Sequence, residues 1–211
     1  MSEIFYVDDL LLTDESYGVV VGKSPEYDAQ IDHLRKSNPD SLDELLDARV
    51  KGTRRLEPEE LPKAFHVERR KKIPNIFRIS DGLTVVSETM KSVLQKLDPG
   101  IHQFFPIQII DSKGINALES YFLFHFFTHK KALVEGQAAI EDRSYNGIEY
   151  RILNTAKINS DPLQLDSSSM EGAHFWRSEE FPKLYFVSTE LLSSVGTAGL
   201  AFYKTNPVEI I

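Results

Sequence analysis

The chain of 211 residues is 41% hydrophobic and 10% aromatic, which fits one domain with a sizeable core, or one domain with an N-terminal extension. No apolar run reaches the ~18 residues needed to span a bilayer, and residues 1–9 are acidic where a secretory signal would be basic. The lack of cysteine excludes disulfides, thiol nucleophiles and cysteine-ligated metal centres. We therefore expect a cytoplasmic protein with no membrane segment.

The net charge of −8 is concentrated near the N-terminus, since residues 1–60 hold 15 acidic and 7 basic side chains. This disfavours nucleic-acid binding, because contacts to phosphates need a basic face. An acidic segment attracts and steers a basic protein partner. A run of carboxylates also keeps a surface solvated, so solubility alone is an alternative role for these residues.

The first sixty residues are predicted to form a β-hairpin followed by a helix. Residues 4–12 and 17–21 have the composition of two strands, which we expect to pair with each other. Within the polar stretch 26–55, apolar residues recur at helical spacing, and Asp40 or Ser41 is the expected N-cap of this helix.

Pro58 and Pro62 bracket a predicted domain boundary. We expect residues 1–60 to form an acidic N-terminal segment, packed on the main domain or apart from it. Residues 61–211 are expected to form that main domain.

The main domain reads as short strands joined by one clear helix and several polar connections. The basic run 69–72 is predicted to be a solvated connector, and residues 154–170 a loop. Residues 121–128 are rich in aromatic side chains and short, which favours a central strand buried on both faces. The predicted strands are residues 63–67, 102–110, 121–128 and 147–153.

One short pattern occurs twice, about a hundred residues apart. Ser87 and Ser188 each end an apolar run, precede acidic and apolar residues at helical spacing, and lie at the same distance before a proline, Pro106 and Pro207. The pattern predicts a strand, a serine N-cap, a short helix and a return strand. We therefore predict an α+β fold with a mixed or largely antiparallel sheet and short serine-capped helices, at 88–97 and 189–195, from this twice-occurring unit.

His125 and His129 are four residues apart and are the residues that best suggest a metal centre. The zincin pattern also requires a glutamate after the first histidine as general base, and a phenylalanine stands there instead. A histidine pair in the core or at the edge of a sheet is the simpler interpretation. A metal-dependent hydrolase using His125, His129 and a nearby carboxylate is kept as an alternative function.

Other catalytic motifs are missing from the sequence. The serines 167–169 and His174 have no Gly-x-Ser-x-Gly turn to expose a nucleophile, and no glycine-rich phosphate loop is present. We expect no enzyme activity, no cofactor and no metal.

The residues most suited to a protein partner are acidic residues of the first sixty and one aromatic–arginine pair. Tryptophan and arginine are frequent in binding hot spots, so Trp176 beside Arg177 is a candidate anchor, with a core position for Trp176 as the alternative. The predicted partner-binding residues are Asp40, Asp43, Glu44, Asp47, Glu57, Glu59, Glu60, Trp176 and Arg177.

Residues 81–88 and 104–107, the aromatic strand from residue 121, and residues 184–192 and 198–202 resemble a bacterial immunity protein family of polymorphic toxin systems. It is the eleventh family of that catalogue and was formerly a domain of unknown function. The resemblance covers about residues 60–211.

Two positions depart from the family pattern. Ala132, Leu133 and Val134 stand where the family has Ala-Leu-Asp, and Ala201 replaces a glycine. Neither change bears on catalysis, because the family has no established catalytic residues.

The resemblance implies a cytoplasmic, non-catalytic antidote that binds a co-encoded toxin and blocks its active site. An acidic antidote suits a toxin with a basic surface. A scaffold or regulatory binding protein unrelated to toxins is a further alternative, and the sequence does not indicate the oligomeric state.

Overall fold

The computed structural model of the chain describes residues 4–8, 20–21, 24–69, 75–78, 83–111, 120–145, 147–158, 162–169, 172–181, 184–195 and 205–211. The helices are α1 (Pro25–Ser37), α2 (Pro39–Lys51), η1 (Pro58–Glu60), α3 (Glu88–Leu97), α4 (Thr155–Ile158), η3 (Ser167–Ser169) and α5 (Thr189–Val195). Each helix within these ranges is too short or too polar to span a bilayer.

Two sheets make up the body of the molecule. The first has the order β2-β3-β6-β7-β5-β4, and the second has the order β14-β1-β13-β12-β8. The strands of the first are β2 (Val20–Val21), β3 (Ala64–Arg69), β4 (Ile76–Arg78), β5 (Thr84–Ser87), β6 (Gln103–Asp111) and β7 (Tyr121–His125). The strands of the second are β1 (Ile4–Asp8), β8 (His129–Lys130), β12 (Phe175–Ser178), β13 (Leu184–Ser188) and β14 (Thr205–Pro207).

Two smaller pairings complete the strand inventory of the described residues. Strands β9 (Ile140–Tyr145) and β10 (Ile148–Leu153) form an antiparallel hairpin, and β11 (Gln164–Leu165) runs parallel to β15 (Glu209–Ile210). In the large sheets the pairs β3–β6 and β8–β12 are parallel and the other pairs are antiparallel. The predicted α+β class with mixed, largely antiparallel sheets is confirmed.

The repeated pattern in the sequence corresponds to a duplicated structural unit. In the first unit the strands lie in the order β4-β5-β7-β6, and in the second they lie in the order β12-β13-β1-β14, with every neighbouring pair antiparallel. Each unit carries its helix, α3 or α5, directly after the second of these strands. In the second unit β1, from the far end of the chain, takes the place of β7.

The two serines occupy the same position in the two units. The Oγ atom of Ser87 accepts from Met90 N at 3.2 Å, and that of Ser188 accepts from Leu191 N at 3.1 Å. Each hydroxyl satisfies a backbone N–H that the first turn of a helix leaves unpaired. The predicted caps of α3 and α5 are therefore confirmed.

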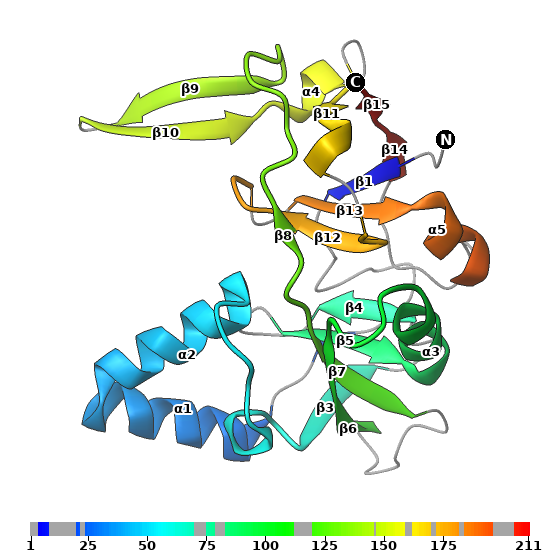
Figure 1. The fold of residues 1–211 in the computed structure, drawn as a ribbon. Coiled ribbons are helices and arrows are strands. Elements are labelled where there is room, and N and C mark those ends of the chain that lie inside the picture. Colours follow the sequence, from blue (N-terminus) through cyan, green and yellow to red (C-terminus); the bar gives the residue numbers. More distant parts are fainter. Residues whose placement is uncertain are drawn as a thin grey trace.

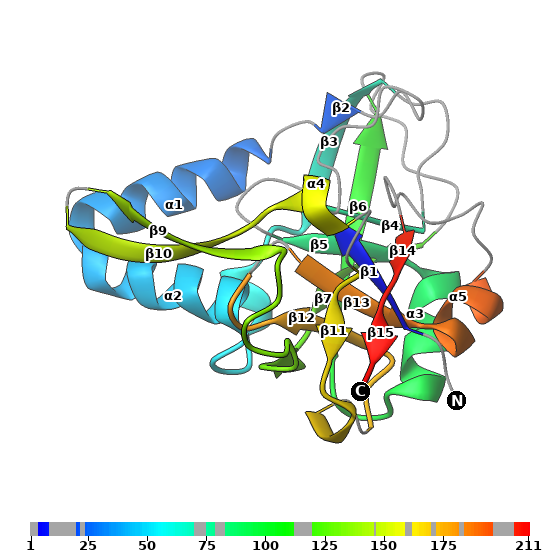
Figure 2. The same cartoon turned by 90° about the horizontal axis from the view of Figure 1, so that it is seen from above.

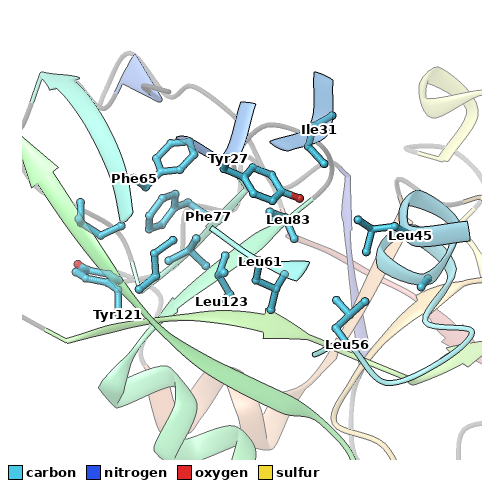
Figure 3. Packing of buried hydrophobic residues seen from close by; sticks show 14 of the residues in the cluster. Tyr27, Ile31, Leu45, Leu56, Leu61, Phe65, Phe77, Leu83, Tyr121 and Leu123 are labelled. Atoms are coloured by element: carbon cyan, nitrogen blue, oxygen red, sulfur yellow. The ribbon is translucent and has the colours of Figure 1, made fainter. Parts of the chain in front are cut away.

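The two sheets form layers of the molecule (Figure 1), and hydrophobic cores cover both faces of each sheet. Helices α1 and α2 cover the outer face of the first sheet, where Tyr27, Ile31 and Leu45 meet Phe65 and Leu123 (Figure 3). A central core between the sheets holds residues of both units, and α3 contacts α5 there. A third core covers the outer face of the second sheet.

Asp98 joins the two units at the end of α3. Its buried carboxylate accepts from the backbone nitrogens of His174, at 3.0 and 3.2 Å, and Phe175, at 3.2 Å, where β12 begins, and it lies 3.4 Å from His102 Nε2. A carboxylate that accepts several hydrogen bonds can be buried at acceptable cost, because the bonds replace its hydration.

The N-terminal segment differs from the prediction in its strand pairing. Strand β1 pairs with β13 and β14, whereas β2 pairs with β3, so the predicted hairpin between residues 4–12 and 17–21 is wrong. Residues 9–19 lie outside the described ranges, as do residues 70–72 of the basic run and residues 198–202.

The predicted helix after Pro39 is present as α2, but its N-cap is Asn38, whose Oδ1 accepts from Ser41 N at 3.3 Å. A second helix, α1, precedes it and was not predicted, and the predicted loop 154–170 contains α4, β11 and η3. Strand β7 is central in its sheet, as predicted, but it ends at His125. The division of the chain near residue 60 stays a prediction.

Candidate partner-binding surfaces

Four of the predicted acidic residues form one exposed face of α2. Asp40, Asp43, Glu44 and Asp47 follow each other at helical spacing of three and four residues, and all four are exposed. The opposite side of the helix places Leu42 and Leu45 in the core. Amphipathic spacing thus turns these carboxylates to solvent, with Asp47 ion-paired to Lys51 at 2.8 Å.

The glutamates in and beside η1, which are Glu57, Glu59 and Glu60, differ in how far their charges are exposed to solvent. Both carboxylate oxygens of Glu60 accept from the guanidinium of Arg54, at 2.6 and 2.9 Å, and this pairing holds the pKa of Glu60 below its ordinary value. The side chains of Glu57 and Glu59 are exposed. The charge of Glu60 is therefore largely neutralised within the molecule, while those of Glu57 and Glu59 face solvent.

Trp176 and Arg177 are buried in β12 and do not lie on the molecular surface. Trp176 is 0% exposed and stacks on Phe186 with ring centres 5.3 Å apart. Arg177 is 3% exposed and donates from Nη2 to His129 Nε2 at 2.7 Å, with its guanidinium 4.9 Å from the centre of the Phe126 ring. Both faces of the sheet are covered at β12. All four residues of this strand are therefore buried, whichever face they point to.

His125 and His129 each have a protein partner. His125 Nε2 lies 3.0 Å from the carbonyl oxygen of Arg54, and His129 accepts from Arg177. Burial, together with the neighbouring charge of Arg177, lowers the pKa of both histidines, that of His129 to about 4. The described residues contain no group of three histidine, aspartate or glutamate side chains that could hold a metal ion.

A surface that the sequence did not indicate lies on the β9–β10 hairpin, which we call the arm. Among the described residues, the most exposed large apolar side chains include Tyr145, Ile148 and Tyr150, at 69%, 70% and 46%. Ile148 pairs directly with Tyr145, and Tyr150 lies two residues further along β10, so the three side chains share one face.

The opposite face of the arm is the one that meets the body. Ile140 and Leu153 pair there and pack against the core of the second sheet. Arg151 continues this face and binds Glu180 at 2.6 Å and Glu135 at 2.7 Å. The apolar residues Tyr145, Ile148 and Tyr150 therefore point away from the body.

The alternation of Ile148, Tyr150 and Ile152 predicted a strand correctly, but it did not tell which way its apolar face would point. An asparagine–glycine pair between two alternating segments is the signal that identifies a hairpin here.

A search among curated proteins returns no match to this chain. A family model for an immunity protein family (Imm11) matches residues 23–206. The N-terminal limit of the resemblance, placed near residue 60 from the sequence, is corrected to residue 23, and α1, α2 and η1 lie inside the matched region. The match covers most of the chain, and the protein belongs to the Imm11 immunity protein family.

Proposed function

We propose that this protein is a non-catalytic cytoplasmic immunity protein, which binds a cognate bacterial toxin and neutralises it. The observation that carries the proposal is membership of the immunity protein family over residues 23–206. Such a protein needs a surface that recognises another protein rather than a reactive centre.

The acidic face of α2 supports a toxin with a basic surface as the partner. Asp40, Asp43, Glu44 and Asp47 lie on one side of α2, and Glu57 and Glu59 are exposed at η1. Exposed charges of one sign raise the rate at which an oppositely charged partner associates. We include these six residues in the proposed binding surface. Glu60 is left out because it is partly buried and bound to Arg54 through both of its carboxylate oxygens, and Trp176 and Arg177 are left out because they are buried.

The proposal is tested with the toxin domain encoded by the neighbouring gene. We expect the purified protein to bind it, with an association rate that falls as salt is added, because salt screens exposed charges. Reversing Asp43, Glu44 and Asp47 to lysine should lower the association rate at low salt at least about tenfold and leave the dissociation rate nearly unchanged.

A control variant with the same net charge separates local from overall charge effects. Glu88→Lys, Glu190→Lys and Glu209→Lys change three other exposed carboxylates, two of them on α3 and α5, which lie on the side of the molecule away from α2 (Figures 1 and 2). This variant should associate faster than the α2 variant. Equal rates for the two variants would contradict a role for the α2 face, and failure of the native protein to bind would contradict the toxin-binding function itself.

A further inference from the structure

The arm projects from the body on the same side as α1 and α2 (Figures 1 and 2). An isolated two-stranded hairpin is only marginally stable in water, so its base must be held by other contacts. Lys157 and Asn154 both bind Glu141 Oε1 at the base, at 2.9 and 2.7 Å, in addition to the contacts of Arg151 on the other face. The arm is fixed before any partner arrives.

Beyond its base, where Ile140 and Leu153 pack on the body, the arm has the reverse of the polarity that a hairpin of a monomeric protein usually shows. A half-buried hairpin normally turns its apolar face to the body and its polar face to water. Here the ion pairs of Arg151 lie toward the body, while Tyr145, Ile148 and Tyr150 lie in solvent. Exposed aromatic and apolar side chains gathered on one face mark a site of protein association.

We infer that this outward face is the apolar anchor of the toxin interface, and that it binds an apolar pocket bordered by basic side chains. The inference rests on the proposed function. Tyrosine is among the residues that contribute most to binding energy at protein interfaces. Because the arm is already ordered, little conformational entropy is lost when it docks.

The charges around the arm indicate which kind of partner can bind to its outward face. Arg143 pairs with Glu141, and Arg151 pairs with Glu135 and Glu180, so the arginines of the arm are neutralised within the molecule. Glu149 forms no ion pair among the described residues and is exposed on the other face of the hairpin. Helix α2, which carries four exposed carboxylates, lies on the same side of the molecule as the arm (Figure 1). A second copy of the chain or an anionic membrane would bring like charges together. A basic protein surface complements them.

The test is a binding measurement with the full chain and the toxin domain of the neighbouring gene, made catalytically inactive. Replacing Tyr145, Ile148 and Tyr150 by serine should weaken binding at least about 100-fold, mainly through faster dissociation. The conservative variant Tyr145→Phe with Tyr150→Phe should bind within about threefold of the native protein, because it keeps the apolar area.

Two matched single variants give the internal control. Ile148→Ser removes an exposed isoleucine from the arm, and Ile211→Ser removes one that is 56% exposed and lies outside it. Thermal unfolding should show the same midpoint for all variants, since these side chains are exposed. Binding should fall about tenfold for Ile148→Ser and stay unchanged for Ile211→Ser.

The outcomes separate this inference from the proposed function. If the native protein binds the toxin domain and the triple serine variant binds it equally well, the arm is not the anchor, while the immunity function stands. If the native protein does not bind the toxin domain, the proposed function fails first. If the native protein is a dimer in sedimentation and the triple variant is a monomer, the face joins two copies and the inference is overturned.

Discussion

His129 lies beside the buried guanidinium of Arg177, at the point where α2 ends against the second sheet. Its Nε2 accepts from Arg177 at 2.7 Å, which requires the neutral ring with the proton on Nδ1. Gly52, the C-cap of α2 with φ of 60°, packs so closely that a Cβ atom there would lie 2.7 Å from His129 Cε1. A glycine is needed at this position for its conformation and for the space.

Because of the contact between His129 and Arg177, we expect the folded protein to lose stability in acid. Burial and Arg177 lower the pKa of His129 to about 4 from an ordinary value of 6.5, so between these values the unfolded chain binds a proton that the folded protein does not. The contribution of His129 is complete above pH 6.5 and is lost as the pH falls toward 4. It amounts to about 1–2 kcal/mol, because one pKa unit corresponds to about 1.4 kcal/mol and solvent screens part of the effect.

Thermal unfolding between pH 7 and pH 4.5 measures this contribution. Glutamine at position 129 still accepts from Arg177 and does not titrate, so His129→Gln should lose less stability over this range than the native protein. The same change at His33, which is exposed on α1, should leave the loss unchanged. Equal losses in the native protein and His129→Gln would show that the histidine is not held neutral.

At the scale of elements, β1 completes the second unit from the opposite end of the chain. Its backbone pairs with β13 from residue 4 to residue 8 and with β14 from residue 5 to residue 7. It is therefore an interior strand, and both of its edges carry ladder hydrogen bonds. Strand β1 lies between β13 and β14 and so connects these two strands in the sheet.

Tyr6→Pro tests this arrangement, because proline removes a backbone donor from the middle of the strand. We expect the thermal midpoint to fall by roughly 5–10 °C. A chain that starts at residue 10 should be destabilised further and should be stabilised by an added peptide of residues 1–9. An unaltered midpoint in Tyr6→Pro would contradict the pairing of β1.

Local elements were predictable where short-range chemistry decides them. The serine caps, α3 and the buried strand β7 follow from side-chain spacing within a few residues. The partner of β1 was not predictable, since neighbouring strands usually pair and here the pairing strands are far apart in sequence. Periodicity also gives no direction for an apolar face, and so β10 was predicted as a strand, whereas its partner β9 and the exposed surface of the arm were not.

In the whole molecule, the two units contact each other through α3, α5 and the central core. Each unit also carries elements that project from it. Helices α1 and α2 extend from the first sheet, and the arm extends from the side of the second sheet, both toward the same side (Figure 1). A partner that approaches from this side would therefore meet both α2 and the arm (Figure 1). The division into units arises from long-range pairing, which the repeat in the sequence indicated only in part.

A protein that neutralises a toxin must restore the growth of cells that express this toxin. The toxin domain of the neighbouring gene is induced alone, with the native protein, and with the triple serine variant of the arm. Growth should be restored by the native protein and not by an equally abundant, folded variant. If cells die as fast with the native protein as without it, while both proteins are made and folded, the protein is not the antidote of that toxin.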